Sequence, residues 1–371
     1  MVNPFSSLGT LTRERIRFIL PPVIAGGLTI LLARLVFFVP FFLVPLGFFV
    51  RFGNKSSRQI SIAVALGILG NTFAGLISGS LTGMTSGFFY GIMADTLYFA
   101  ILILVFIWAV HPKPFLIRGI QIRTAYRLAL ASFIASLALL PLVWLARRDE
   151  GLVAFITSQA EVLATAAKEA AGADVVQRSL LERELSADTL TSLMAMALSR
   201  GASLGHMVFL SLSVRIADTI LAFRARVRFA KALTNGTADQ HTMNLRILSP
   251  PSLSGYRNSP YLVWVLISTL VTVLGSFVFK IEYLEIVSWN LLSVCAFLYL
   301  AQGLAIVSFN LARPGVPRML RPLAAFMTVL LLFRPGINAI LIVALAIIGV
   351  AENWLPLRVV GKTEPPPTPG A

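Results

Sequence analysis

Residues 85–110 read TSGFFYGIMADTLYFAILILVFIWAV, an apolar run whose only charged residue is Asp95. A hydrocarbon core about 30 Å thick needs about 20 helical residues, so this run is long enough to cross a membrane. The rest of the chain has the same character, because 57% of its 371 residues are hydrophobic and 13% are charged, against about 25% charged in soluble domains. The composition excludes soluble, disordered and coiled-coil proteins, and the single cysteine excludes a disulfide scaffold.

Further apolar runs of similar length divide the chain into candidate spans. They cover residues 60–77, 128–146, 201–223, 261–280 and 286–310. Two longer stretches, 18–50 and 322–355, are too long for one span and are interrupted by proline, glycine and arginine. Each is better explained as a helical hairpin. The sequence therefore predicts an all-α, polytopic transmembrane helix bundle of about ten spans, or eight if an end hairpin is re-entrant.

The net charge of +15 is distributed in basic bursts between the apolar runs. With a cytoplasmic N-terminus, every burst falls on the cytoplasmic side, as the positive-inside rule requires. We therefore expect a multi-pass protein of the cell (inner) membrane with both termini in the cytoplasm and with anionic lipid headgroups at the basic loops. Because the basic residues form no single soluble patch, nucleic acid is not expected as a partner.

One segment departs from this charge pattern. Residues 147–200 carry eight acidic and six basic residues, and apolar residues recur there at helical spacing. We expect a small extracytoplasmic hairpin of amphipathic helices. The predicted organisation is N-terminal transmembrane helices (1–146), this extracytoplasmic segment (147–200), C-terminal transmembrane helices (201–358) and a disordered proline-rich tail (359–371).

Five glycines recur at every fourth position, namely Gly75, Gly79, Gly83, Gly87 and Gly91. Small residues at this spacing let helices approach closely in lipid, so the pattern predicts a structural role in helix packing. The alternative is a partly unwound backbone that lines a cavity.

Two acidic residues fall inside predicted spans. Asp218 lies near an arginine-rich end and one turn from Arg215, which predicts a structural ion pair. Asp95 lies about ten residues inside its span, with Tyr98 one turn away and no basic residue nearby in sequence. An intramembrane carboxylate suggests function by default. Asp95, Tyr98 and Gln302 are therefore our candidates for binding a substrate or ion, with structural pairing or interhelical hydrogen bonding as the alternatives.

Known catalytic and metal-binding motifs are absent from the sequence. His111, His206 and His241 are widely spaced, and no zinc-ligand spacing occurs. We expect no catalytic residue, no metal and no cofactor, and an intramembrane enzyme ranks third among the functional hypotheses.

The C-terminal half carries three short motifs in succession. A linker, PPSLSGYRNSP, covers residues 250–260; Gln302-Gly303 follows inside a span, and the half closes with Gly349, Glu352, Trp354 and Arg358. In this order the features resemble the YybS-like family of bacterial membrane proteins of unknown function, although the ending departs from that family's Asp and Phe-Arg. The family is distantly similar to the substrate-binding components of energy-coupling-factor transporters. The resemblance implies a transporter-like component, with a membrane or ATPase partner subunit.

Two functional hypotheses follow. The first is a bundle that binds or moves a small molecule or ion, for which Asp95 or Gln302 should face a polar cavity near the middle of the membrane. The second is a non-transporting scaffold for cell-envelope proteins, which should be solidly packed there.

Overall fold

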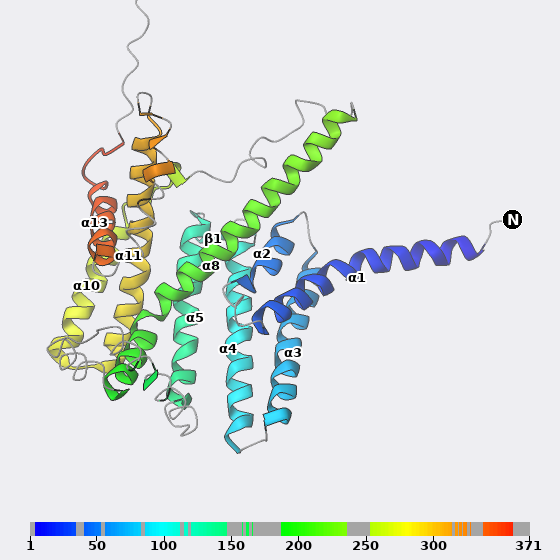
Figure 1. The fold of residues 1–371 in the computed structure, drawn as a ribbon, viewed down its shortest axis with the longest axis horizontal. Coiled ribbons are helices and arrows are strands. Elements are labelled where there is room, and N and C mark those ends of the chain that lie inside the picture. The colour runs from blue at the N-terminus through cyan, green and yellow to red at the C-terminus, as the bar shows by residue number, and fades with distance from the viewer. Residues whose placement is uncertain are drawn as a thin grey trace, which may run out of the picture. The chain divides into compact units, whose positions relative to one another are not determined.

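The computed structural model of the chain is built almost entirely of α-helices (Figure 1). It describes residues 4–34, 41–52, 56–82, 86–111, 115–117, 120–146, 187–235, 253–313 and 337–358, with isolated residues between 158 and 165 and between 316 and 327. The chain divides into two compact units. Unit 1 comprises Met1–Pro250 and Thr272–Val294, and unit 2 comprises Pro251–Val271 and Cys295–Ala371.

Six of the described helices lie wholly within unit 1. They are α1 (Pro4–Arg34), α2 (Val44–Arg51), α3 (Ser57–Thr82), α4 (Ser86–Val110), α5 (Thr124–Ala146) and α8 (Ala187–Thr234). Between α4 and α5, the short strands β1 (Phe115–Ile117) and β2 (Ile120–Ile122) pair antiparallel, with Leu116 opposite Gln121. The helices α10 (Leu262–Phe279) and α11 (Glu282–Leu311) contribute residues to both units. Unit 2 also contains the 3₁₀ turn η2 (Leu253–Gly255) and α13 (Ile337–Ala351).

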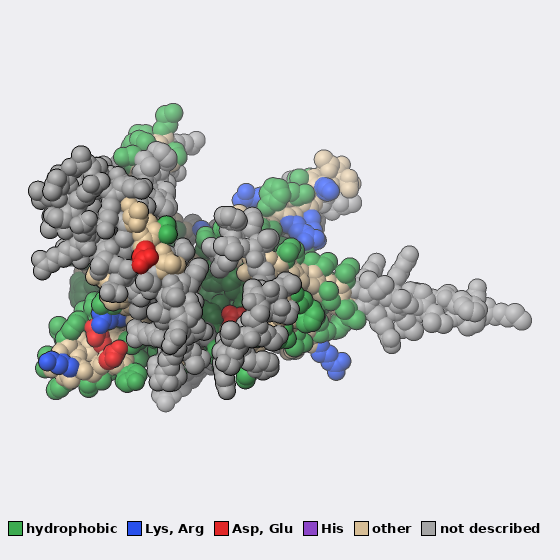
Figure 2. All heavy atoms as spheres, turned by 60° about the horizontal axis from the view of Figure 1, so that its bottom comes forward, with side chains coloured by type: hydrophobic (Ala, Val, Ile, Leu, Met, Phe, Trp, Pro, Cys, Tyr) green, Lys and Arg blue, Asp and Glu red, His purple; other side chains and the backbone are tan. Residues whose placement is uncertain are grey.

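Within the described residues, six helical segments are long and apolar enough to cross a membrane. They are Ser57–Ile77, Ile92–Val110, Thr124–Pro141, Ser199–Lys231, Leu262–Phe279 and Glu282–Leu311. Two shorter apolar helices, Phe18–Ala33 and Asn338–Ala351, lie in the two stretches expected to form hairpins. Hydrophobic side chains also cover much of the described surface in Figure 2. The prediction of an all-α, polytopic membrane bundle is confirmed, whereas the total of eight to ten spans stays a prediction.

From Phe18 on, α1 packs against the first half of α3, and the two helices run in the same direction. Gln59 Nε2, near the start of α3, donates to the carbonyl oxygen of Phe18 at 3.0 Å. Further along both helices, a Cβ added to Gly26 would lie 2.9 Å from the Ala63 carbonyl oxygen, and one added to Gly70 would meet the Ile30 side chain. Residue numbers increase together along the contacts of the two helices. The chain between them must therefore lead back along the length of α1 before α3 begins. This return supports the hairpin expected for residues 18–50.

The short helix α2 lies at the core of unit 1. Leu43 and Leu46 are fully buried, and a Cβ added to Gly47 would lie 3.1 Å from the Phe106 ring of α4. The Phe42 ring lies 5.2 Å from that of Phe99 (centroid to centroid). Eight residues of helix rise only about 12 Å, which is well short of a membrane crossing. The described part of this arm, residues 41–52, is therefore too short to cross the membrane by itself.

The segment from 147 to 200 is only partly described. The two amphipathic helices expected there fall almost wholly outside the described residues, as does the proline-rich tail. The continuously described part begins at Ala187, where a single helix of 48 residues runs to Thr234. The expected boundary at residue 200 therefore falls inside α8, because residues 187–200 continue without a break into the following span.

Candidate functional site

A polar strip on α3 and α4 contains the candidate Asp95. Asn71 Nδ2 of α3 donates to Asp95 Oδ2 at 3.2 Å. One position further along each helix, the hydroxyls of Thr72 and Thr96 lie 3.2 Å apart. Asn71 is buried, whereas the Asp95 side chain is exposed on the surface of the chain. Sequence reasoning found no local partner for Asp95, and the structure supplies an amide in place of a cation.

The exposure of Asp95 has an electrostatic consequence. Asp95 lies in the third turn of α4, a helix that is apolar on both sides of it. A carboxylate facing hydrocarbon is strongly disfavoured, and one neutral amide does not balance its charge. The Asp95 face of α4 must therefore meet water, a proton or cation, or a polar partner.

The second candidate on α4, Tyr98, contacts a histidine and not Asp95. The Tyr98 hydroxyl hydrogen-bonds to His206 Nε2 of α8. His206 Nδ1 lies 2.7 Å from the Ala202 carbonyl oxygen and 3.0 Å from Ser136 Oγ of α5. A carbonyl can only accept, so in neutral His206 the hydrogen is on Nδ1, and Nε2 accepts from Tyr98. This chain joins α4, α8 and α5.

His206 was not among the predicted site residues, because the three histidines of the sequence are not spaced as metal ligands. Its role here is different, since both ring nitrogens hydrogen-bond to other helices. No group of three metal-ligating side chains occurs in the described part of the chain. The signal that could have revealed His206 is its position inside a predicted span, where a polar side chain needs a partner on another helix; that partner is Ser136.

Asn290 of α11 makes a second buried junction in unit 1. Its Nδ2 donates to the Ser199 carbonyl oxygen at 2.6 Å, and its Oδ1 accepts from the Ser203 backbone N–H at 2.9 Å. In a regular helix the Ser203 N–H donates to the Ser199 carbonyl oxygen. The side-chain amide of Asn290 binds both of these backbone groups and is thus inserted at this point in the backbone hydrogen bonding of α8. An ion pair of 2.8 Å between Arg200 and Glu285 lies beside it. The interhelical role considered for polar residues in spans therefore applies to Asn290.

Asp218, the second acid within a span, pairs with Arg51 at the end of α2. The two residues are 167 positions apart, so local spacing could not reveal the partner. Both side chains are partly buried, at 23% exposure for Arg51 and 21% for Asp218. A structural ion pair was expected for Asp218, but the partner that the structure gives ties α2 to α8, and the pair with Arg215 stays a prediction.

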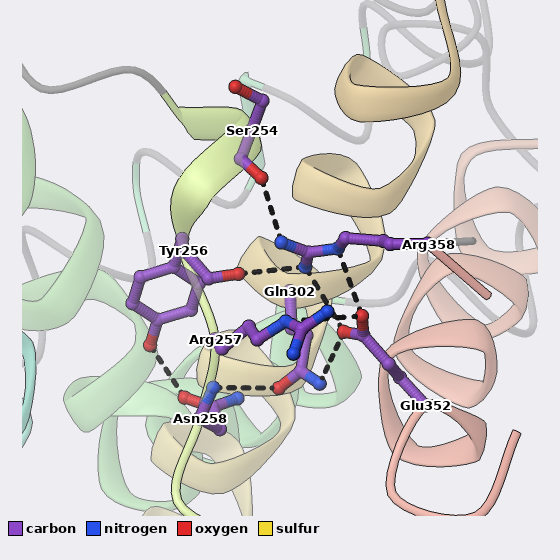
Figure 3. Close-up of polar contacts among 7 residues, drawn as sticks. All are labelled: Ser254, Tyr256, Arg257, Asn258, Gln302, Glu352 and Arg358. Carbon is purple, nitrogen blue, oxygen red and sulfur yellow. Dashed lines mark hydrogen bonds and ion pairs between the residues drawn. The ribbon is translucent and has the colours of Figure 1, made fainter. Parts of the chain in front are cut away.

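The third candidate, Gln302, belongs to a buried polar cluster in unit 2 (Figure 3). Its Oε1 accepts from the backbone N–H of Asn258 at 3.0 Å, and its Nε2 donates to Glu352 Oε2 at 2.8 Å. One amide thus joins the linker before α10 to the residue that follows α13. Asn258 lies just before α10 begins at Leu262, so this contact puts Gln302, nine residues before the end of α11 at Leu311, level with the start of α10. A position of Gln302 near the middle of the membrane stays a prediction.

Glu352 and Arg358 form the charged centre of this cluster. Arg358 Nη2 donates to Glu352 Oε2 at 3.0 Å, and Arg358 Nε lies 2.9 Å from Glu352 Oε1. The side chains are 6% and 3% exposed, respectively. Arg358 also donates to the carbonyl oxygens of Ser254 and Tyr256, at 2.7 and 2.8 Å. Burial lowers the pKa of Arg358, and the Glu352 carboxylate opposes this shift.

The linker is held in place by its own side chains as well. The Tyr256 hydroxyl donates to Asn258 Oδ1 at 2.7 Å, and Asn258 Nδ2 donates to the Leu298 carbonyl oxygen at 2.9 Å. Arg257, whose side chain is 62% exposed, places Nε 3.7 Å from Glu352 Oε1 (Figure 3). The aromatic and arginine residues quoted for the linker motif are thus parts of one cluster.

Two glycines make the cluster possible by letting α11 and α13 touch. A Cβ added to Gly303 would lie 1.9 Å from the Leu345 carbonyl oxygen, and one added to Gly349 would lie 2.1 Å from that of Tyr299. No side chain can occupy either position at this separation. The Gln302-Gly303 pair therefore combines an amide for the cluster with the contact that brings α13 to it.

The glycine ladder is only partly described. Gly75 and Gly79 lie in α3, Gly87 and Gly91 lie in α4, and Gly83 falls outside the described residues. The close packing predicted for these five glycines stays a prediction.

The helices and the buried polar junctions define a multi-pass, α-helical integral membrane protein. Over residues 241–351 the chain matches the family model described as "Predicted membrane protein (DUF2232)". The matched region includes the linker, Gln302-Gly303 and Gly349, and it ends one residue before Glu352. No curated protein and no solved structure matches the chain.

Proposed function

We propose that this membrane protein binds or moves a small molecule or ion at the polar strip formed by Asn71, Thr72, Asp95 and Thr96. The observation that carries the proposal is the exposed carboxylate of Asp95 inside an apolar helix, held by the buried amide of Asn71. An exposed intramembrane acid is retained at an energetic cost, which is typical of ion and substrate pathways.

The chemistry of the strip favours a proton or a small cation. Its side chains offer one carboxylate, one amide and two hydroxyls, and oxygen ligands of this kind suit hard cations. Tyr98 follows Asp95 by one helical turn, so the chain through His206 to Ser136 begins beside the strip. Together these groups offer a route for hydrogen-bonded exchange between α4, α8 and α5.

We also propose a membrane location, an orientation and a partner for the protein. The distribution of basic residues supports a cell (inner) membrane location with both termini in the cytoplasm and with anionic headgroups at the basic loops. The resemblance to the YybS-like family, and its distant similarity to energy-coupling-factor components, supports a transporter-like component with a membrane or ATPase partner subunit.

Replacing Asp95 by asparagine tests this proposal. The full chain is reconstituted into liposomes that contain pH-sensitive or cation-sensitive dyes, and Asp95→Asn is compared with Leu97→Ala, which changes an exposed apolar residue of the same helix. We expect proton or cation flux in the unchanged protein and in Leu97→Ala, and flux at the level of empty liposomes in Asp95→Asn. Equal flux in the two variants would contradict a role for Asp95.

A non-transporting scaffold for envelope proteins is the second proposal. The closed cluster in unit 2 favours it, because Gln302, Glu352 and Arg358 are committed to internal bonds. In that case the Asp95 strip docks a polar helix of a partner. A photo-crosslinking amino acid at Leu97 in native membranes should then capture a defined protein, and the capture should be lost in Asp95→Asn although no flux is measured.

A further inference from the structure

Unit 1 contains an apolar pocket between α1, α2 and α8. Its volume is about 780 Å³, which lies within the range of about 300–1,000 Å³ found for small-molecule sites. Leu20 and Leu28 of α1, Phe48 of α2 and Ile216 of α8 are among its lining residues. Arg224 is the one charged residue of this lining. The pocket is therefore suited to a hydrocarbon ligand that has a negative charge at one end.

Arg224 marks the charged end of the pocket. The lining residues of α8 run from Ile216 to Arg224, about 12 Å by helical rise. Both Arg224 and Arg228, one turn further on, are exposed. Their guanidinium carbons lie 4.7 and 5.3 Å from the centroid of the Phe52 ring. Stacking on an aromatic face orients a guanidinium and leaves its in-plane N–H donors able to bind a phosphate.

The pocket has the depth that a membrane lipid requires. Its α8 side lies within the apolar segment Ser199–Lys231, and its α1 side lies within the apolar helix Phe18–Ala33. Arg224 and Arg228 fall in the last two turns of the α8 segment, where a span reaches the headgroup region. The apolar wall thus extends from the headgroup level into the hydrocarbon level.

We propose that this pocket binds one anionic phospholipid, with an acyl chain along the phenylalanine-rich wall and the phosphate at Arg224 and Arg228. An acyl chain that moves from the bilayer into an apolar pocket stays in an apolar environment, so the chain itself adds little selectivity. The headgroup charge provides it, because a basic residue at the membrane surface favours an anionic lipid. We expect each of the two arginines to contribute about fivefold in affinity.

Native mass spectrometry of the full chain tests the proposal, with phosphatidylglycerol and phosphatidylcholine as probes. Two test variants, Arg224→Gln in the lining and Arg228→Gln beside it on the Phe52 ring, are compared with Arg226→Gln, a control on the same helix outside the lining. We expect one retained phosphatidylglycerol, bound about fivefold more weakly in each test variant and within about twofold of normal in the control. Free glycerol phosphate should not displace it, since the acyl chain is part of the ligand.

A second variant separates loss of binding from loss of folding. Ile220→Phe places a larger side chain on the α8 wall and keeps both arginines, so it should reduce retention of phosphatidylglycerol without changing the elution profile of the protein. The proposal is overturned if Arg224→Gln and Arg226→Gln retain the lipid equally, if phosphatidylcholine binds as tightly as phosphatidylglycerol, or if glycerol phosphate alone displaces it. A second copy of the chain filling the pocket, seen as a dimer that excludes lipid, would overturn it as well.

Discussion

At the scale of single residues, Glu352 is the side chain on which most of unit 2's polar contacts converge. It accepts from Gln302 and Arg358 through Oε2, and Arg257 lies close to Oε1. A buried charge is tolerated only when it is paired and hydrogen-bonded. The cluster meets this condition for both Glu352 and Arg358, whose side chains are almost completely buried. The pair fixes the segment after α13 against the linker before α10.

Glu352→Gln should therefore destabilise the protein strongly, because it leaves the Arg358 guanidinium buried without its counter-charge. Breaking one side of a buried pair costs about 3–5 kcal/mol, and we expect a large fall in the thermal unfolding temperature in detergent. The double variant Glu352→Gln/Arg358→Met removes both charges and should cost less than the sum of the single variants. Additive losses would show that the two residues act independently.

Residue by residue, the sequence identified polar groups better than it identified their partners. Asp95, Asp218 and Gln302 are conspicuous because a polar side chain in an apolar run has an energetic cost that must be offset. Their partners lie on other helices, and periodicity carries information only about neighbours within one helix. Arg51, which pairs with Asp218 from 167 positions away, was thus out of reach of any local pattern.

At the scale of secondary-structure elements, close backbone contact determines how α13 meets α11. Gly303 and Gly349 face backbone atoms of the opposite helix at distances that leave no room for a Cβ. In lipid, helices gain little from hydrophobicity when they associate, so such contacts and interhelical hydrogen bonds must hold them together. The Gly303 contact and the Gln302 bond to Glu352 lie at adjacent positions of α11 and act together.

Gly303→Ala tests this contact. The added Cβ would lie 1.9 Å from the Leu345 carbonyl oxygen, and because that atom belongs to the backbone, the helices have to separate. We expect a loss of about 1–3 kcal/mol in unfolding free energy, the usual cost of overpacking. Gly275→Ala in α10 is the control, since its nearest neighbour is a flexible Phe279 ring atom 4.0 Å away. Equal stability of the two variants would contradict the close contact.

The sequence predicted whole elements more successfully than their ends. Long apolar runs gave the spans, because a hydrocarbon core sets a minimum length. The helix α2, between α1 and α3, was predicted only as part of a hairpin. It is short and packs against Phe106 and other residues of unit 1, and periodicity does not distinguish a short buried helix from part of a full span.

At the scale of the whole molecule, the relative directions of the helices follow from the contacts between them and from their order along the chain. Since α1 and α3 run in the same direction, we expect the start of α1 and the start of α3 on the same side of the membrane. Each following span in unit 1 reverses direction, through α4 and α5 to α8. The sorting of basic residues by the positive-inside rule predicts the same arrangement.

Single-cysteine accessibility can test this arrangement, because the chain has one native cysteine, Cys295, which is buried and can be replaced by alanine. Cysteines introduced as Asn54→Cys and Lys231→Cys should react with a membrane-impermeant maleimide only from the cytoplasmic side. Met84→Cys and Lys168→Cys should react only from the opposite side, because α3 separates Asn54 from Met84, and the apolar segment of α8, which ends at Lys231, separates Lys231 from Lys168. If Lys168→Cys and Lys231→Cys are labelled from the same side, α8 does not cross the membrane. The placement of His206 and Arg224 at different membrane depths along α8 would then be wrong, and with it both the hydrogen-bonded route beside Asp95 and the lipid site at Arg224.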